Sequence, residues 1–287
     1  MQDVYQIITD RLLTILEAGT VPWRKPWAGG VAESVNLVSG RAYRGFLNRM
    51  LLGLSGHDSP FWLTYRQAQA LGGKVRRGEK GSPVIFWKIY EKDDPQAEDG
   101  KKRLPILRYY TVFNVEQCEG ITVPAPEDST WAEHDPIKEA EAVILAMPNP
   151  PTIEVGGTRA CYSPSRDRVR VPDLFRYDKP EEYYSTYFHE LAHSTGHKSR
   201  LNREGIVDRH FFGDPVYSRE ELVAEMAAAF LCGHTGIENV TIENSAAYLQ
   251  SWIRTLRGDK KLAITAGGQA QKAADYILDR KATLEGG

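Results

Sequence analysis

Cysteine is scarce in this 287-residue sequence, and its scarcity excludes several kinds of protein. The three cysteines, Cys118, Cys161 and Cys232, are odd in number and widely spaced, with no C-x-x-C pair. They therefore exclude a disulfide framework and a cysteine zinc cluster. Proteins without disulfides are typical of reducing compartments, so the sequence predicts a cytoplasmic location.

Long apolar runs are also missing. No stretch approaches the ~18 apolar residues that a membrane helix needs, so no membrane partner is expected. The first segment, "MQDVYQIITDRLLTILEAG", carries acids and has the apolar spacing of an amphipathic helix, unlike a signal peptide. A composition with 41% hydrophobic and 26% charged residues then indicates an ordinary globular protein.

Charge is distributed unevenly along the chain. Residues 1–125 hold 17 Lys+Arg and 13 Asp+Glu, a net of +4, which leaves 19 and 25, a net of −6, for the remainder. Between residues 20 and 90 the imbalance sharpens to 11 basic against 3 acidic residues, a net of +8. This asymmetry favours a polyanion-binding segment followed by a segment with a different function. A basic face that only contacts solvent would give the same excess of basic residues.

The pattern of expected elements is mixed. A strand pair is predicted around a glycine turn in residues 74–90, followed by a polar loop over residues 92–103. Residues 120–137 are rich in proline and acid and are predicted to be a linker. Helices and a short hairpin follow. The sequence therefore predicts an α+β protein with two domains, residues 1–125 and 126–287.

The segment "FHELAHSTGH" carries a metal-binding pattern. His189 and His193 are four residues apart, so on a helix they lie on one face and can reach the same ion. Glu190 lies beside the first histidine, where a carboxylate can act as general base. The pattern predicts a zinc metallopeptidase-type site, with another divalent ion such as Mn²⁺ as the alternative metal.

The third ligand is less clear from the sequence. His197 follows Gly196 directly, and Ser199 stands where a metzincin would have its third histidine, so His197 does not fit. The alternative is a glutamate on the next predicted helix, "REELVAEM", as in gluzincins. Glu221 and Glu225 share a helical face there. We expect Glu221 to be the ligand and Glu225 to support a ligand histidine, with the reverse assignment left open.

Other parts of this half have weaker signals. Glu220 points about 100° away from Glu221 on a helix and is expected to be a surface charge. Tyr217 and His210 precede the glutamate helix and could donate hydrogen bonds to an oxyanion, although Tyr217 is better explained as a packing residue. The segment "YSPSRDRVRVP" is predicted to supply the edge strand to which a peptide substrate adds.

The basic half interleaves cations with aromatic residues. Aromatic rings can stack on unpaired bases while cations contact phosphates, which is the pattern of single-stranded nucleic-acid binding. No recognition-helix signature indicates duplex binding. Taken one by one, most of these aromatic residues are expected in the core, because this domain has few other large apolar groups. The candidate DNA-binding residues are Trp23, Arg24, Lys25, Trp27, Arg41, Tyr43, Arg44, Lys74, Arg76, Arg77 and Lys80.

Six motifs together resemble the ArdC family of plasmid antirestriction proteins. They are "PWRKPW", "NLVSGRAYRGFLN", "WLTYRQAQALGGKVRRGEKG", "YYTVFNVEQCEG", "HELAHSTGHKSRLNRE" and "EELVAE". The resemblance runs nearly end to end. It implies an N-terminal single-stranded-DNA-binding domain, a module that also precedes some plasmid primases, and a C-terminal zincin-like metallopeptidase domain. The layout is similar to that of Spartan-type proteases.

The resemblance implies a protein that protects incoming conjugative plasmid DNA from host restriction. An alternative is a DNA-tethered metalloprotease that cleaves DNA-bound or host proteins as its main activity. The intact Glu190 favours this second hypothesis, because a purely structural metal needs no general base.

Overall fold

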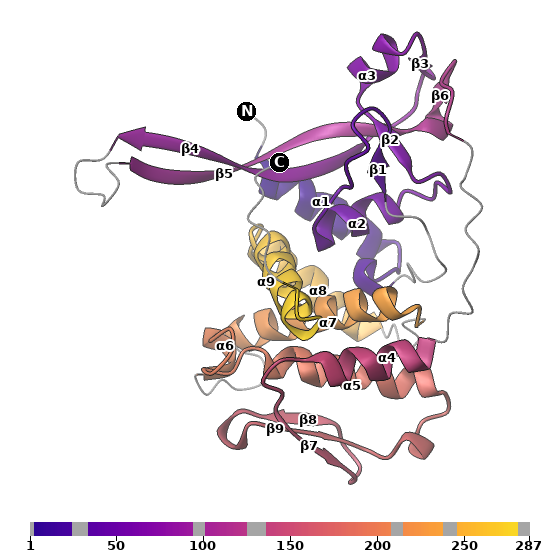
Figure 1. Cartoon of the computed structure of the whole chain (residues 1–287). Coiled ribbons are helices and arrows are strands. Elements are labelled where there is room, and N and C mark those ends of the chain that lie inside the picture. The colour runs from indigo at the N-terminus through magenta and orange to yellow at the C-terminus, as the bar shows by residue number, and fades with distance from the viewer. Residues whose placement is uncertain are drawn as a thin grey trace. The chain divides into compact units, whose positions relative to one another are not determined.

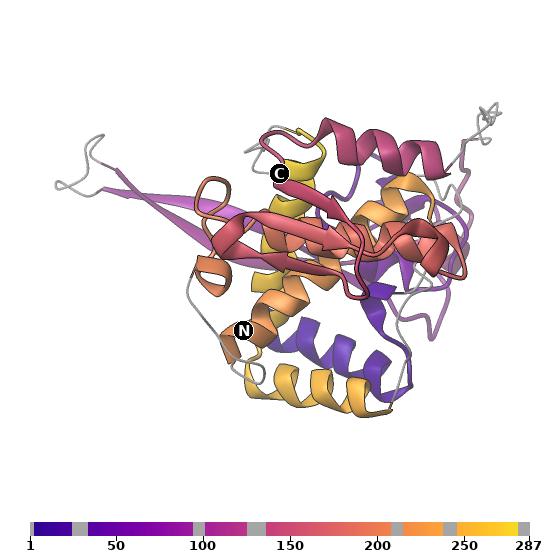
Figure 2. The same cartoon turned by 90° about the horizontal axis from the view of Figure 1, so that it is seen from below.

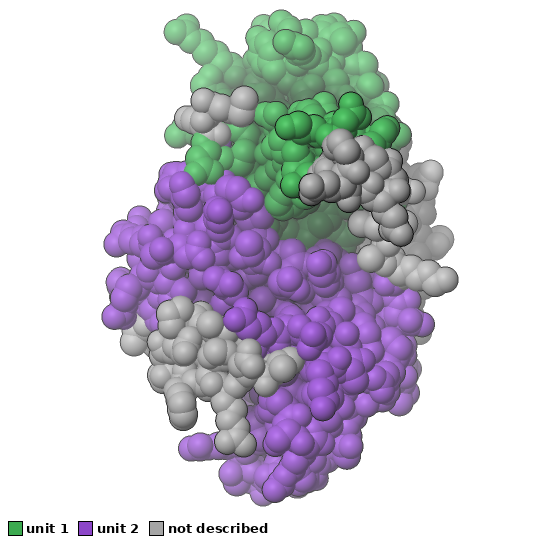
Figure 3. Space-filling view, turned by 90° about the vertical axis from the view of Figure 1, so that its left-hand side faces the viewer, with its two compact units in different colours: residues 1–4, 32–125, 283–287 green, residues 5–31, 126–282 purple. Residues whose placement is uncertain are grey.

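The computed structural model describes residues 3–24, 34–93, 101–124, 136–207, 215–237 and 246–280. The chain forms two compact units, one of residues 1–4, 32–125 and 283–287 and one of residues 5–31 and 126–282 (Figure 3). Both mix helices with strands, which confirms the predicted α+β class (Figure 1). We call them the first and the second unit.

The first unit is built on a four-stranded sheet in the order β1-β2-β5-β4. Its helices and strands are β1 (Val35–Asn36), α2 (Phe46–Gly53), β2 (Phe61–Leu63), α3 (Tyr65–Ala70), β3 (Lys74–Val75), β4 (Ser82–Asp93), β5 (Lys101–Asn114), the short helix η2 (Val115–Gln117) and β6 (Cys118–Glu119). The core of this sheet is formed by Tyr43, Leu52, Trp62, Val84 and Val112.

Two strand predictions in this unit are wrong. β3 does not pair with β4 around the glycine turn but with β6, through Lys74–Glu119 and Val75–Cys118. β4 instead pairs with β5 over its whole length, from Ser82–Val112 to Asp93–Lys101. The strands therefore continue through part of the predicted loop of residues 92–103. A polar composition did not prevent strand formation because cross-strand pairing supplies the backbone hydrogen bonds.

A close backbone approach holds β3 against β6. A Cβ built on Gly73 would lie 2.6 Å from the carbonyl oxygen of Glu119 and 2.3 Å from Cδ1 of Ile121. Only glycine fits at such a distance, because any side chain would push the two strands apart. This contact positions the basic segment that follows Gly73.

The second unit is mostly helical. Its helices and strands are α1 (Val4–Glu17), η1 (Pro22–Arg24), α4 (Pro136–Ala146), β7 (Thr152–Val155), β8 (Cys161–Ser163), η3 (Pro164–Arg166), β9 (Arg168–Val171), η4 (Leu174–Arg176), α5 (Pro180–Ser194), α6 (Glu204–Val207), α7 (Pro215–Thr235), α8 (Ala246–Gly258) and α9 (Leu262–Ile277). The sheet β7-β9-β8 packs on α5 (Figure 2). None of the helices in the described ranges is both long and apolar enough to cross a membrane.

The N-terminal helix packs in the second unit, which differs from the predicted division at residue 125. Thr9 of α1 donates a hydrogen bond to the carbonyl of Lys260 at 2.8 Å. The ring of Trp23 packs edge-on against Trp252 with the centroids 5.7 Å apart. The apolar face of α1 thus closes the helical core of the second unit, where Ile8 and Leu12 are fully buried.

Candidate metal centre and basic surface

The helix α5 carries the two histidines of the metal-binding pattern. Pro180 occupies its first turn, and Glu181 and Glu182 in that turn interact favourably with the positive end of the helix dipole. α5 packs along α7. His189 and His193, one turn apart on α5, therefore face a carboxylate of α7.

Four potential ligand atoms, from three residues, meet between these helices. The Nε2 atoms of His189 and His193 are 3.1 Å apart. Oε2 of Glu221 lies 3.6 Å from Nε2 of His189, and Oε1 of Glu221 lies 3.5 Å from Nε2 of His193. Ligands ~2.0–2.1 Å from a tetrahedral ion are about 3.3–3.4 Å apart, so these separations fit one ion. Two imidazoles and one carboxylate suit Zn²⁺ and also accept other divalent ions such as Mn²⁺.

Glu190 adds an acidic group beside this set. Its residue is only 9% exposed, and its charge contributes to the raised pKa of His193. A bound divalent ion would polarise a carbonyl and activate water, which is the chemistry that such a centre supplies. Glu190 is the group of this chain that could accept a proton from that water and pass it to a leaving group.

His193 is held from both sides by carboxylates of α7. While its Nε2 faces Glu221, its Nδ1 lies 3.4 Å from Oε1 of Glu220. Burial alone would lower the pKa of His193, but the hydrogen bond with Glu220 and the charges of Glu221 and Glu190 raise it to about 9. The contact with Glu220 also fixes the orientation of this ring, so that Nε2 faces Glu221 and His189.

Arg203 in turn fixes Glu220. Its guanidinium donates to both carboxylate oxygens of Glu220, at 2.9 and 2.6 Å, and also to Thr195 Oγ1 and the carbonyl of Ala192. Burial would raise the pKa of Glu220, but the hydrogen bonds from Arg203 and His193 hold it below its usual value. Glu220 therefore remains an anion although its side chain is only 6% exposed.

The approach of Arg203 to α5 depends on Gly196. A Cβ at this position would lie 2.6 Å from Cγ1 of Ile206 and 3.0 Å from a guanidinium nitrogen of Arg203. Both distances are shorter than normal contacts, so a side chain would displace the segment that carries Arg203. Gly196 occupies the position of the glycine in the metzincin pattern. Here it makes room for an arginine, whereas in metzincins it allows a third histidine to reach the metal.

The structure brings together some of the predicted site residues and not others. His189, His193 and Glu221 form a group of potential ligands, and Glu225 is outside that group. Glu220 is buried and was wrongly expected at the surface. Sequence reasoning also missed Arg203, because no spacing rule links it to Glu220, 17 residues later in the chain.

The remaining predictions for this unit have different outcomes. His197 contacts Ser199 Oγ at 2.8 Å and lies outside the ligand group, as its poor fit to the metzincin pattern predicted. His210 and the side chain of Tyr217 lie outside the described residues. Of the predicted edge segment, only β8 lies at an edge, because β9 pairs with β7 on one side and β8 on the other.

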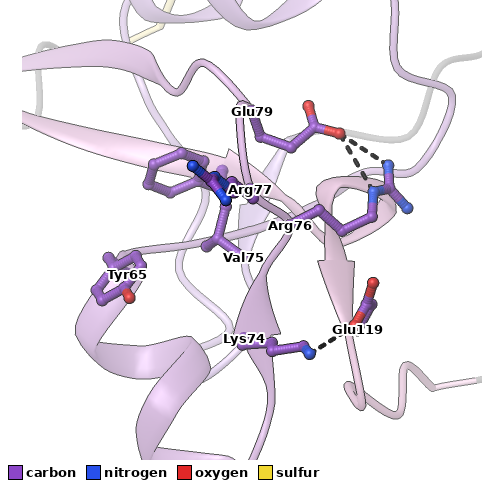
Figure 4. Close-up of a pocket in the computed structure, with 8 residues that line it drawn as sticks. Tyr65, Lys74, Val75, Arg76, Arg77, Glu79 and Glu119 are labelled. Atoms are coloured by element: carbon purple, nitrogen blue, oxygen red, sulfur yellow. Dashed lines mark hydrogen bonds and ion pairs between the residues drawn. The ribbon is translucent and has the colours of Figure 1, made fainter.

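The first unit carries a basic pocket of about 530 Å³ near β3 (Figure 4). Two of its cations already have acidic partners. Lys74 lies 3.1 Å from Glu119, and Arg76 lies 3.0 Å from Glu79. Arg77, which also lines the pocket, and the exposed Lys80 have no acidic partner within ion-pair distance among the described residues. These two cations are therefore the ones that remain available to an anion.

The other predicted DNA-binding residues are divided. Arg41 and Arg44 are exposed, as a phosphate contact requires. Tyr43 is buried, with its hydroxyl accepting a hydrogen bond from Asn36, and burial raises its pKa to about 12. The fully buried Trp23 belongs to the core of the second unit. Neither ring can stack on a base. Lys25, Trp27 and the side chain of Arg24 lie outside the described residues.

Comparisons with protein families divide the chain in two. Residues 2–113 match the model of the N-terminal domain of anti-restriction factor ArdC. Residues 138–269 match a zincin-like metallopeptidase model. The second match covers α5 and α7, so it contains the whole candidate metal centre.

Full-length relatives agree with these matches. The crystal structure of antirestriction protein ArdC from the R388 plasmid, in its metal-free form, is 38% identical, with a TM-score of 0.72 over 97% of both chains. Its Mn(II)-bound form is 37% identical, with a TM-score of 0.74 over 99% of this chain and 100% of that one. Protein y4eC of Sinorhizobium fredii is 34% identical over 96% of this chain and 91% of the relative.

Two longer relatives match nearly the whole of this chain. DNA primase TraC of Escherichia coli is 36% identical over 96% of this chain, and a second TraC primase of the same species is 34% identical over 96%. This chain spans 27% and 20% of their lengths.

Proposed function

Because the chain belongs to the ArdC family of antirestriction proteins and has a zincin-like metallopeptidase domain, we propose that it binds single-stranded DNA and protects incoming conjugative plasmid DNA from host restriction. Its second unit would hold Zn²⁺, or another divalent ion such as Mn²⁺, in a peptidase-type site. Its partners would be single-stranded DNA and a protein substrate, and its place of action the cytoplasm.

The short distances between the potential ligand atoms of three residues support the metal half of this proposal. His189, His193 and Glu221 hold nitrogen and oxygen atoms 3.1–3.6 Å apart, as ligands of one small ion would be. Glu220 and Arg203 fix one of these rings before any ion binds. The site is thus organised in advance, which lowers the free-energy cost of binding.

The DNA half rests on charge and exposure. Residues 20–90 have a net charge of +8, and within the first unit Arg41, Arg44, Arg77 and Lys80 are exposed. Such cations attract phosphates at long range and release counterions on contact. A protein that coats a strand in this way blocks a nuclease stoichiometrically, without a chemical step.

One observation favours a second function, a DNA-tethered metalloprotease. Glu190 is an acid that is 9% exposed and lies beside two metal-ligand candidates. Burying a carboxylate costs free energy unless a cation or hydrogen-bond donors pair with it, so a buried carboxylate at this position requires an explanation. Catalysis would account for its position, whereas a purely structural metal would not.

The two functions are separated by restriction of an incoming plasmid in cells that make equal amounts of wild type and Glu190→Ala. We expect protection to survive the substitution, because strand coating needs no general base. The control is that metal content and DNA affinity of the purified variant equal those of wild type. Full loss of protection with both controls unchanged would instead make proteolysis the mechanism.

A further inference from the structure

The outer part of the β4–β5 hairpin is an exposed two-stranded ribbon. β2 pairs with β5 only at Leu63–Phe113 and Trp62–Asn114, whereas β4 and β5 continue together as far as Asp93–Lys101. In Figure 1 these two strands extend well beyond β1 and β2 of the same unit. Among the described residues, no third strand covers either edge of this outer part. Most side chains of this outer part, Lys88, Lys92 and Lys102 among them, are exposed to solvent, where a partner can contact them.

The register sorts the ribbon's side chains into two faces. Residues directly opposite each other share a face, and successive residues alternate between faces. One face, which we call the cationic face, comprises Phe86, Lys88, Tyr90 and Lys92 of β4 and Lys102, Leu104, Ile106 and Arg108 of β5. The opposite face, which we call the neutral face, comprises Trp87, Ile89, Glu91, Asp93, Lys101, Arg103, Pro105 and Leu107.

The two faces differ in their balance of acidic and basic residues. The neutral face has two acids and two bases, and Glu91 contacts Lys101 at 2.9 Å and Arg103 at 3.5 Å. The cationic face has four bases and no acid. Moreover, Lys92 lies directly opposite Lys102 in the register. Like charges in that position destabilise a strand pair, so this end of the ribbon would gain stability from a bound polyanion.

Aromatic and aliphatic groups lie between the cations. Nζ of Lys88 is 5.1 Å from the ring centre of Tyr90, and Arg108 donates to the Tyr90 hydroxyl at 3.3 Å. Leu104 and Ile106 are 38% and 39% exposed on the opposite strand. Cations that alternate with a ring and exposed apolar groups suit a ligand that has both phosphates and unpaired bases, and a duplex hides its base faces.

We propose that the cationic face of the β4–β5 ribbon binds single-stranded nucleic acid, with lysines on the phosphates and Tyr90 against a base. This inference rests on the proposed function and deepens it, because it assigns DNA contact to residues outside the basic segment that the sequence singled out. It also commits to one face of the ribbon, which makes the opposite face a built-in control.

The test compares two double variants of the full-length protein. Lys92→Ala with Lys102→Ala removes two positive charges from the cationic face. Lys101→Ala with Arg103→Ala removes two from the neutral face of the same ribbon end, so long-range attraction falls equally in both. Binding to a fluorescent oligothymidylate is followed by anisotropy as salt is varied, with hairpin duplex DNA as competitor.

We expect the cationic-face variant to lose roughly 25-fold in affinity at 0.1 M salt. At that salt concentration each lost phosphate contact to a single strand lowers the logarithm of the binding constant by about 0.7, which is about fivefold. Its salt slope should fall by about 1.4, or 2 × 0.7. The neutral-face variant should lose much less affinity, and the dependence of its affinity on salt should equal that of wild type. Equal losses in the two variants, with wild type binding well, would overturn the inference and leave the proposed function intact.

A pair of ring variants tests the base contact separately. Tyr90→Val should weaken binding ~5-fold or more by removing a stacked base, while Trp87→Val on the neutral face should not. Valine keeps the preference for strand in both. If wild type binds no single strand at low salt, the proposed function itself fails. Tighter binding to duplex, or ribbon-dependent self-association in light scattering, would contradict this inference.

Discussion

The two units of this protein hold their charged side chains in opposite ways. In the second unit, Arg203 and Glu220 are 7% and 6% exposed and satisfy each other and their neighbours through a connected set of hydrogen bonds. In the first unit, the lysines on the ribbon and the cations after β3 are exposed, and Lys92 faces another cation, Lys102.

This difference predicts how each unit responds to substitution. A buried charge lowers stability unless it is paired and hydrogen-bonded. Removing one member of the buried network therefore leaves the other charges unpaired, and the loss of stability is large. Exposed cations act through a screened field and through separate phosphate contacts, so their losses are graded and nearly additive. The following substitutions test this contrast, beginning with the largest expected effect.

Loss of a metal ligand should have the largest effect. Glu221→Ala or His193→Ala should abolish stoichiometric metal in the purified protein, a greater loss than the ~10–100-fold caused by removing a ligand's hydrogen-bond partner. Metal content by mass spectrometry is the measurement. His197→Ala is the matched control and should keep full metal, since that ring contacts Ser199 instead. Loss of metal in this control alone would overturn the assignment.

Glu190 should show the next largest effect, and on a different property. Glu190→Gln should reduce any peptidase activity by about 10²–10⁴-fold, because it removes the group that transfers the proton. Metal content should not change, since both histidines and Glu221 remain. The measurement is cleavage of a protein mixture or of DNA-bound protein by wild type and variant. Retained cleavage in the variant would assign the proton transfer elsewhere.

The sequence allowed the metal centre to be predicted as far as local geometry decides it. Helical spacing alone places His189, Glu190 and His193, and the structure brings Glu221 to both rings. Spacing within α7 could not identify Glu220, because its role depends on Arg203, 17 residues earlier in the chain. Two adjacent carboxylates can bracket one imidazole because its two nitrogens point in different directions, which a rule of shared helical faces overlooks.

Glu220 therefore provides an intermediate effect. Glu220→Gln should reduce metal affinity ~10–100-fold, because His193 loses the anion that orients its ring. Glu220→Ala should also lower the free energy of unfolding by ~3–5 kcal/mol, because it leaves Arg203 buried and unpaired. Metal titration and urea denaturation measure the two effects.

Glu225→Gln is the matched control for Glu220, on the same helix and expected from the sequence to support a histidine. Glu225→Gln should change metal affinity less than Glu220→Gln does. The reverse order would restore the role that the sequence favoured for Glu225, and it would mean that the 3.4 Å contact between Glu220 and His193 does not fix the ring.

The first unit was harder to predict for a different reason. Its charge pattern is visible in the sequence, but strand pairing decides which face each cation occupies. Residues 92–103 have the composition of a loop, yet their two ends pair with each other, in register with the rest of β4 and β5, and so become part of the ribbon. Burial likewise removed Trp23 and Tyr43 from the candidate surface, because an aromatic residue in a basic segment serves a core as readily as a base.

Single cations of the segment after β3 should have the smallest effects. Arg77→Ala and Lys80→Ala should each weaken single-strand binding about fivefold at 0.1 M salt and reduce the salt slope by ~0.7, because each would lose one phosphate contact. The matched control removes an existing ion pair as a unit, Lys74→Ala with Glu119→Ala, and should leave affinity and slope nearly unchanged.

The double variant of Arg77 and Lys80 decides whether the first unit behaves as the contrast requires. Independent exposed contacts predict that the two losses multiply to about 25-fold, with a slope change of about 1.4. A loss much larger than this product, or one that also lowers the melting temperature, would mean that these cations belong to a connected network like that of Arg203. DNA binding by the first unit would then depend on cations held in a connected set of hydrogen bonds, and the difference between the two units would disappear.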